Sequence, residues 1–443
     1  MWYSARVLGL LVGGVALAFS VSGSAVAADL TVPILKAPAA TPTAPTSWWS
    51  TFEISGHVEG GITFNPDDPA GDINFGHLFT DKANRVLLNQ ALVTAQRPLD
   101  PKATGYDFGF KFQAMYGSDA RYTHFLGEFD RSISDINQFD IVEAHALFHL
   151  PWLTTGGIDV KVGQYVTLEG AEVIYAPDNL LYSHSYIFNF GIPFKHTGIM
   201  TTTHVSSEFD LYLGADTGVN TTFGSGDNNS AGAFHGGVGL NLLGGNLTVL
   251  ATTHIGPENP NVPAVRAACA CDPNSALRYL NDVTITWKVN DNLTLITDLN
   301  YIRDDGFNVS GGGVAQYFAY KFNDVYKLVG RAEIWADPNA FFVNAFPGNL
   351  DFVNAELGLP ATVISGGKTT YGSLTLGLNI TPEVPKGGPI KAVIFRPEIR
   401  FDTSLNNTKP FDPAPACPVP LTTAVCGTKS SQFTIGGDAI VKF

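Results

Sequence analysis

A strict alternation of apolar and polar residues is the feature that most constrains this chain. In "FEISGHVEGGITF", residues 52–64, every second residue from Phe52 is apolar or glycine, and the residues between them are mostly polar, with two acids and a histidine. Successive side chains of a β-strand point to opposite faces, so the segment predicts a strand with one apolar and one polar face. It is longer than the usual strand of about 5–6 residues. Its apolar face must therefore meet either a protein core or lipid.

The same alternation recurs along the whole chain. In "KAVIFRPEIRFD", Val393, Phe395, Ile399 and Phe401 share one face, and charged residues occupy the other. Many strands of roughly 10 residues, with few charges on the apolar face, favour a membrane barrel over a soluble sandwich. The predicted strands cover residues 52–64, 85–97, 104–116, 139–150, 158–167, 194–204, 207–217, 232–242, 246–256, 279–288, 292–302, 313–321, 325–336, 369–380, 390–403 and 432–443.

Composition supports an all-β transmembrane antiparallel barrel. The chain is 45% hydrophobic and 12% aromatic but only 15% charged, and it contains 46 glycines. Beyond the N-terminus, no run approaches the roughly 18 consecutive apolar residues of a membrane helix. A net charge of −14 argues against nucleic acid as a partner.

The N-terminus has the pattern of an export signal. Arg6 precedes an apolar run from Val7 to Val21, and Ala25-Val26-Ala27 supplies the small residues of a cleavage site. We therefore expect a signal peptide at 1–27, with a retained signal anchor as the alternative. A Pro/Ala-rich stretch at 28–50 predicts an extended periplasmic linker, and 51–443 would form the barrel.

The links between the predicted strands alternate in length. Long links at 65–84, 117–138, 168–193, 218–231, 257–278, 303–312, 337–368 and 404–431 alternate with short ones such as "LGGN" and "FND". Bacterial outer-membrane barrels have long external loops, short periplasmic turns and an even strand count. The pattern predicts about 16 strands, enough for an aqueous channel.

Charged and polar residues on the predicted inner face are candidate pore-lining residues. They are Lys111, Glu143, His145, Arg331, Glu333, Arg396, Glu398, Arg400 and Asp402. The last six alternate in sign on two strands, so they either rigidify the wall or create a transverse field that sorts solutes. The inner face carries more acids than bases, which predicts a mild cation preference. Replacing both Arg396 and Arg400 by Gln should strengthen that preference.

The long link 168–193 is the candidate constriction loop. It mixes the acids Glu169, Glu172 and Asp178 with many aromatic residues. A loop this apolar is expected to pack against the protein, because a loop extended into solvent would leave its aromatic side chains exposed. We predict that it folds inward and narrows the pore, with an ordered cap on the barrel rim as the alternative.

The cysteines and the C-terminus give three further expectations. Cys417 and Cys426 lie in one external loop, where an oxidising environment favours a disulfide between them. Cys269 and Cys271 could bridge locally, pair with the other loop or stay reduced. A metal site is a minor alternative for them, because Cys-x-Cys lacks a second pair of ligands. The final strand ends on Phe443, which looks like the C-terminal signal by which outer-membrane barrels are recognised for assembly.

No catalytic, cofactor or metal site is expected from the sequence. Motifs for a nucleophilic serine, a zinc protease or a phosphate loop are absent. His145 and His149 would lie roughly 13 Å apart on a strand, too far to share one zinc ion. A barrel enzyme and an adhesion or scaffolding barrel remain minor alternatives, and no plug domain of a TonB-dependent receptor precedes the strands.

Three segments resemble a known family. They are "VGQYVTLEGAEVIYAPDNLLYSHSYIFNFGIPFKHTGI" (Val162–Ile199), "KLVGRAEIWADP" (Lys327–Pro338) and "LGLNITPE…IFRPEIRFDTS" (Leu376–Ser404), and together they are similar to the OmpL-like β-barrel porin family. The resemblance implies an outer-membrane barrel with passive pore activity.

We therefore expect an outer-membrane porin of a Gram-negative bacterium, a water-filled channel for ions and small hydrophilic solutes. The alternative is a substrate-selective channel of the same architecture, for sugars or sugar acids. Expected partners are outer-membrane lipid and lipopolysaccharide, the barrel assembly machinery and the solutes. A homotrimer is usual for barrels of this size, although the sequence shows no interface signal.

Overall fold

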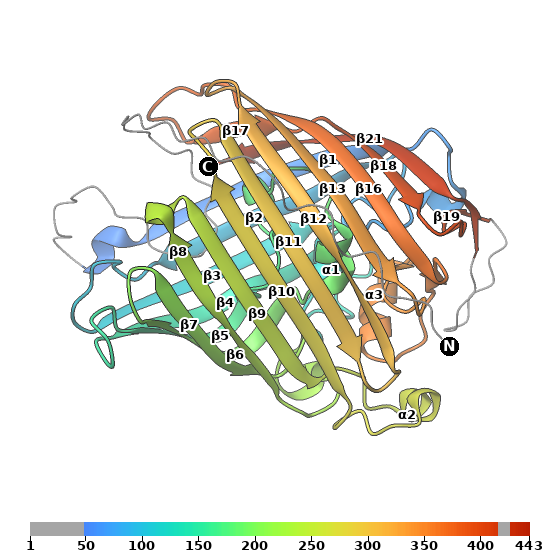
Figure 1. Ribbon diagram of the computed structural model, residues 1–443, viewed down its shortest axis with the longest axis horizontal. Coiled ribbons are helices and arrows are strands. Elements are labelled where there is room, and N and C mark those ends of the chain that lie inside the picture. The colour runs from blue at the N-terminus through green and yellow to red at the C-terminus, as the bar shows by residue number, and fades with distance from the viewer. Residues whose placement is uncertain (1–47, 415–425) are drawn as a thin grey trace, which may run out of the picture. The chain divides into compact units, whose positions relative to one another are not determined.

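The computed structural model describes residues 48–414 and 426–443. The expected signal peptide, nearly all of the expected linker and Cys417 therefore lie outside the described residues. Within the described residues, long antiparallel strands build one sheet that closes on itself (Figure 1).

Each strand of this sheet pairs with its neighbours in the chain, and the last strand pairs with the first. The register of β1 against β21, from His57 opposite Lys442 to Phe64 opposite Ile435, closes the ring. The strands are β1 (Glu53–Phe64), β2 (Val86–Arg97), β3 (Asp107–Gly117), β4 (Gln138–Leu150), β5 (Ile158–Val166), β6 (Lys195–His204), β7 (Phe209–Asp216), β8 (Ala233–Leu242), β9 (Leu247–Pro257), β10 (Leu277–Lys288), β11 (Leu293–Asp304), β12 (Val309–Lys321), β13 (Tyr326–Asp337), β16 (Thr369–Ile380), β17 (Ala392–Phe395), β18 (Glu398–Ser404) and β21 (Ser431–Lys442).

The predicted strand 390–403 is interrupted at Arg396 and Pro397, which separate β17 from β18. Proline has no backbone N–H to donate to a neighbouring strand, so the ladder is broken there. Both pieces pair with β16 and β21 and occupy one place in the ring. The closed barrel thus has 16 strand positions, which confirms the predicted fold class.

Short elements decorate the loops. They are two small hairpins, β14 (Asn344–Ala345) with β15 (Ile364–Ser365) and β19 (Phe411–Pro413) with β20 (Gly427–Lys429), the helices α1 (Ala120–Thr123), α2 (Pro263–Cys269) and α3 (Asp351–Glu356), a π-turn at Ile187–Gly191, and 3-10 turns at Trp48–Thr51, Ala70–Asp72, Ala176–Asp178, Gly224–Gly226 and Leu243–Gly245. No helix in the described part of the chain is long and apolar enough to span a membrane.

One predicted long loop is short in the structure. The link expected at 303–312 shrinks to residues 305–308, because β11 and β12 continue their pairing as far as Asp304 opposite Val309. Asn308 adopts a left-handed conformation, with a φ of 53°, and asparagine tolerates that conformation better than most residues. The sequence "SGGGV" in this region lacks side chains that would have marked it as strand.

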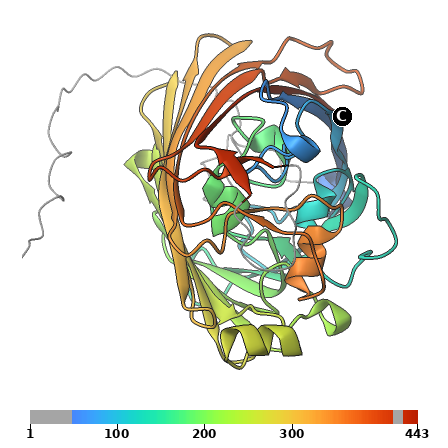
Figure 2. The same ribbon diagram turned by 90° about the vertical axis from the view of Figure 1, so that its right-hand side faces the viewer.

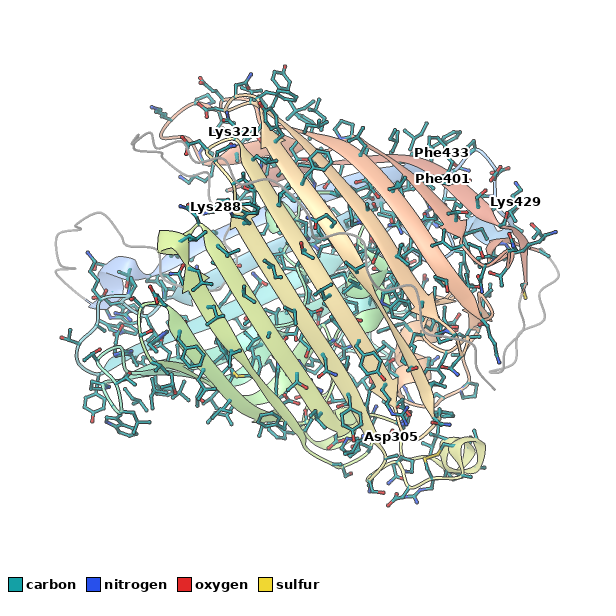
Figure 3. The ribbon with its side chains drawn as sticks, in the orientation of Figure 1. Lys288, Asp305, Lys321, Phe401, Lys429 and Phe433 are labelled. Atoms are coloured by element: carbon teal, nitrogen blue, oxygen red, sulfur yellow. A yellow bond between two sulfur atoms is a disulfide. The ribbon has the colours of Figure 1, made fainter. Side chains whose placement is uncertain are left out.

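Burial in the barrel is reversed relative to a soluble protein. On β1 the apolar Ile54 is 66% exposed and Val58 is 43% exposed, whereas His57 is fully buried and Glu59 nearly so. The same reversal holds on β18 and β21, where the paired Phe401 and Phe433 point outward (Figure 3). Lys288 and Lys321 lie at one end of the strands, and Asp305 and Lys429 lie towards the other (Figure 3). An apolar outer band between charged ends is the arrangement that lipid requires.

The C-terminal residue takes part in barrel closure. The backbone N–H of Phe443 donates to the Gly56 carbonyl at 2.9 Å, and the Gly56 N–H donates to the Phe443 carbonyl at 3.0 Å. The Phe443 ring lies where a side chain at Gly56 would be, since a Cβ there would come within 2.7 Å of the ring. Glycine at position 56 therefore makes room for the terminal aromatic ring.

Candidate permeation site

Loop 167–194, the segment between β5 and β6, lies inside the barrel. It starts and ends on one wall, at β5 and β6. It hydrogen-bonds to β2, three strand positions from β5, and also to β13 and β18, which lie far around the ring. A loop bonded to opposite walls must cross the lumen. Figure 2, seen towards one end of the barrel, shows the green segment within the ring of strands. These contacts are the observations on which a constriction role for the loop can be proposed.

Two inner-face glutamates hold the backbone of this loop. Glu398 accepts hydrogen bonds from the N–H groups of Tyr182 and Ser183, at 2.9 and 3.1 Å. Glu333 accepts from Tyr186 and Ile187, both at 2.9 Å. A carboxylate that accepts two backbone N–H groups is fixed in position and forms strong, charge-assisted bonds. These two residues thus anchor the loop to the wall.

Arg331 anchors the loop through Glu172. Its guanidinium donates to Glu172 at 2.6 Å and to the Ser183 carbonyl at 2.8 Å, and all three residues are buried. Burial alone would raise the pKa of the Glu172 carboxyl. The Arg331 charge, the His184 ring and the Ser185 N–H outweigh that effect and lower the pKa to about 2. Glu172 is therefore an anionic anchor and not a free charge in the pore.

The two arginines of "RPEIR" also bind the loop. Arg396 donates to the carbonyls of Ala176 and Asn179, at 2.8 and 2.9 Å, and its other contacts are with Glu59 and Asp438. Arg400 donates to the His184 carbonyl at 2.6 Å and pairs with Asp402 at 2.8 Å. The charged residues of this strand therefore bind loop 167–194 as well as one another. Neither the rigid wall nor the transverse field expected from the sequence included these contacts with the loop.

The other predicted loop acids take different positions. Glu169 is 2% exposed, and neither of its carboxylate oxygens has a hydrogen-bond partner among the described residues. Burial, with Asp282 and Asp216 nearby, raises its pKa well above the usual value, so it is held as the neutral acid. Asp178 ends the short 3-10 turn Ala176–Asp178, whose first carbonyl binds Arg396.

Two further loops fill the lumen beside loop 167–194. In the loop between β1 and β2, Asp81 pairs with Arg121 at 2.7 Å, and Tyr122 also donates to Asp81 at 2.9 Å. Arg121 and Tyr122 belong to α1, which is entirely buried. Phe79 packs edge-on against Tyr122 and Phe194, with ring centroids 5.6 Å apart in each case. These contacts join the loops in one buried cluster beside loop 167–194.

The inner wall at β3, β4 and β5 is more open. Lys111 pairs with Glu143 at 2.5 Å, and 28% of its side chain remains exposed. His145 bonds the Gln164 carbonyl at 3.0 Å, and His149 lies 2.6 Å from Asp159. The two histidines thus have separate partners. Lys111 is the predicted pore-lining residue that meets solvent.

Sequence patterns missed several residues that position the loop. Asp282 accepts from the Gly170 N–H and Asp298 from the Ala171 N–H, both at 3.1 Å, and Asn300 donates to the Gly191 carbonyl at 3.0 Å. Alternation placed Asp282 and Asp298 on the inner face, but no local signal indicates which loop they meet.

The cysteines of α2 form a local bridge. Cys269 and Cys271 are joined by a disulfide, one of the states that the sequence left open. The predicted pairing of Cys426 with Cys417 involves a residue outside the described range and stays a prediction.

A comparison of the sequence with known families identifies the family of this chain. The family described as "Putative beta-barrel porin-2, OmpL-like" matches residues 51–443. The chain belongs to this porin family. The resemblance drawn from three segments is thereby confirmed, and the protein is a porin-type channel barrel. No curated protein sequence matches the chain significantly.

Solved structures share the fold at very low sequence identity. The outer membrane channel DcaP of Acinetobacter baumannii has a TM-score of 0.52 and 13% identity, covering 88% of this chain and 97% of its own. The anion-selective porin from Comamonas acidovorans has a TM-score of 0.55 and 10% identity, covering 88% and 99%. OprB of Pseudomonas putida has a TM-score of 0.50 and 11% identity, covering 89% and 94%. These likenesses support the porin barrel architecture and carry no information about solute.

Proposed function

We propose that this porin is a narrow passive channel whose cross-section is set by loop 167–194. The observation that carries the proposal is the set of anchors described above, in which Glu333, Glu398, Arg331, Arg396 and Arg400 hold the loop across the lumen. Rigid anchors keep the loop at a fixed position, so ions and small hydrophilic solutes would pass beside it at a steady rate. Catalysis has no support from the family or from the fold.

Deleting residues Glu172–Ser183 tests this proposal. The deletion removes much of the loop segment that bonds to the far walls. It should raise single-channel conductance in a planar bilayer severalfold. Assembly is checked by the heat-dependent shift in gel mobility that folded barrels show. A correctly assembled deletion with wild-type conductance would contradict the proposed role of the loop.

A cavity between the external loops favours substrate selectivity as the second candidate. It has a volume of about 590 Å³ and lies among loop 167–194 and the segments after β9, β11 and β13. Its lining combines the aromatic rings of Phe190, Phe341 and Phe346 with the carboxyl group of Glu258 and the guanidinium of Arg278. Pockets of this size and mixed character bind small molecules. Liposome swelling with a series of sugars and sugar acids would reveal selectivity as a rate that does not simply fall with solute size.

The same proposal places the protein in the outer membrane of a Gram-negative bacterium. It rests on the lipid-compatible outer face and the family, with lipid, lipopolysaccharide and the assembly machinery as partners and Phe443 as the assembly signal. We expect N-terminal sequencing of the membrane-inserted protein to start at Ala28, after cleavage of the signal peptide. A sequence that starts at Met1 would contradict the export signal. A homotrimer stays a prediction, which cross-linking in membranes can check.

A further inference from the structure

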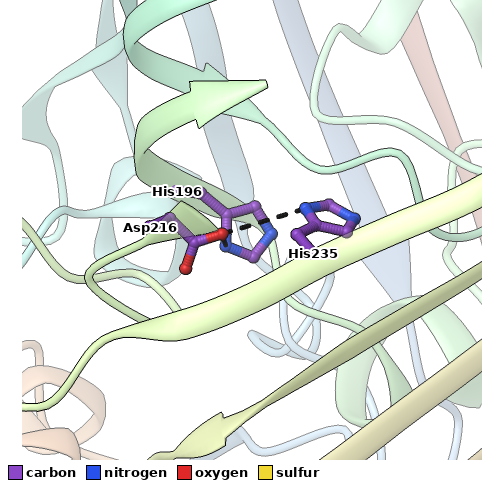
Figure 4. A group of neighbouring side chains, drawn as sticks. All are labelled: His196, Asp216 and His235. Atoms are coloured by element: carbon purple, nitrogen blue, oxygen red, sulfur yellow. Dashed lines mark ion pairs between the residues drawn. The ribbon is translucent and has the colours of Figure 1, made fainter. Parts of the chain in front are cut away.

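Four buried side chains meet on the inner face of adjacent strands β6 to β9. His196 comes from β6, Asp216 from β7, His235 from β8 and His254 from β9, and the three histidines are 0% exposed. His235 lies directly opposite His254 in the strand register. The ring centroids of His196 lie 4.7 Å from those of both other histidines. Figure 4 shows His196 and His235 directed towards the Asp216 carboxylate.

This cluster contains unsatisfied polar atoms. Both ring nitrogens of His235 and the Oδ2 atom of Asp216 have no hydrogen-bond partner among the described residues, and neither does Nδ1 of His254. Burying a polar atom without a partner is costly, so native proteins rarely leave several together. Oδ2 of Asp216 faces Nδ1 of His196 at 3.4 Å and Nδ1 of His235 at 4.0 Å. Nδ1 of His254 instead faces Oε1 of Glu258 at 3.6 Å. Oδ2 of Asp216 and the Nδ1 atoms of His196 and His235 therefore face one another.

The spacing of these atoms fits a metal ion. Metal bonds of about 2.0–2.1 Å in a tetrahedral site place neighbouring ligand atoms about 3.4 Å apart. The ligand atoms of His196, Asp216 and His235 all lie within 4.8 Å of one another. Two imidazoles and one carboxylate suit a transition-metal ion such as Zn²⁺ and suit Ca²⁺ or Mg²⁺ poorly, because those ions prefer oxygen ligands.

Outer contacts would orient the ligands. Nε2 of His254 lies 3.0 Å from Oδ1 of Asp216, which leaves Oδ2 directed at the other two histidines. Nε2 of His196 lies 3.3 Å from the Thr167 hydroxyl, at the start of loop 167–194. Such second partners fix the ring orientation of metal-bound histidines. Nδ1 of His196 also lies 3.3 Å from the Gly218 carbonyl, and metal binding would replace that contact.

We propose that His196, Asp216 and His235 bind one divalent transition-metal ion, of the class of Zn²⁺. The ion would join β6, β7 and β8 across their register, at the foot of the loop that crosses the lumen. Because the ligands are buried, the ion is captured while the barrel assembles and then exchanges slowly. The site is independent of the proposed conduction, since it lies in the wall.

The test measures metal bound to the full mature barrel, purified without a polyhistidine tag. Elemental analysis by mass spectrometry should find about one transition-metal ion per chain, either as isolated or after refolding from urea with Zn²⁺. Refolding with Co²⁺ should give the visible absorption of a tetrahedral site. Less than about a tenth of an ion per chain under both conditions would overturn the proposal.

Matched variants locate the ion. In His235→Gln and in Asp216→Asn, the metal content per chain should fall at least about tenfold, as expected when a ligand is removed. The control His57→Gln removes a buried histidine on β1, bonded to Gln90 at 2.9 Å, and should keep it. If the ligand variants fail to assemble, the cobalt spectrum and the stoichiometry of the wild-type barrel still decide. Equal metal content in ligand variants and control would assign the ion elsewhere and overturn the site.

Discussion

Two parts of the inner wall carry the same types of charged residue, but the burial and the hydrogen-bond partners of these residues differ. On β13, on β18 and at Arg396, which lies between β17 and β18, the charged side chains are buried, and most of them hydrogen-bond to the backbone of loop 167–194. On β3 and β4, Lys111 and Glu143 pair with each other, and Lys111 remains partly exposed. We call these the anchoring wall and the open wall. The comparison shows that a charge on an inner strand can hold a loop or face the solute path, and only its partner decides which.

The largest expected effect comes from weakening the hydrogen bonds between the anchoring wall and loop 167–194. The double variant Glu333→Gln, Glu398→Gln replaces two charged acceptors, each holding two backbone N–H groups, by neutral amides. We expect severalfold higher and noisier single-channel conductance, because the loop loses its strongest anchors. The matched control is Glu143→Gln on the open wall, which should leave the channel size unchanged. Equal conductance in both variants would remove the distinction between the walls.

A smaller effect is expected from a single lysine on the open wall. Lys111→Gln removes a partly exposed positive charge and the direct ion pair of Glu143. The reversal potential in asymmetric salt should shift towards cations, with nearly unchanged conductance, and the shift should shrink at high salt because of screening. No shift would show that Lys111 lies off the permeation path.

The same measurement on Arg396 and Arg400 distinguishes the two walls. From sequence, replacing both by Gln was expected to strengthen cation preference. Because both donate to loop carbonyls, we now expect the double variant to raise conductance or to impair assembly as well. A clean shift in reversal potential with unchanged conductance would instead support the transverse field.

The smallest effect is a pH dependence of the Arg331–Glu172 anchor. The pKa of Glu172 is lowered from 4.5 to about 2. A lowered pKa in the folded protein means that the pairing stabilises the loop fully above about pH 4.5 and loses this effect as the pH falls through about 2. Conductance should stay constant from pH 7 to about 5 and rise only near the lower limit. Glu172→Gln should abolish that rise, and a rise beginning above pH 5 would assign it to another group.

The metal site that we propose has no signature in the sequence. Only His145, His149 and the closely spaced cysteines were considered, because they are near one another in the chain. His196, Asp216 and His235 lie on three strands and have no motif spacing. Antiparallel pairing brings them together, and it can do so for residues at any separation.

The sequence alone determined the barrel, its strands and the direction of nearly every strand side chain. It could do so because lipid forces apolar residues outward at every second position, and this period is local. Loop length determined the topology for the same reason, apart from the hairpin at 305–308. Tertiary structure decided which wall meets loop 167–194, why Glu172 is anchored while Glu169 is neutral, and where the histidines converge. Those outcomes depend on pairing between distant segments, and no pattern within one segment records its partner.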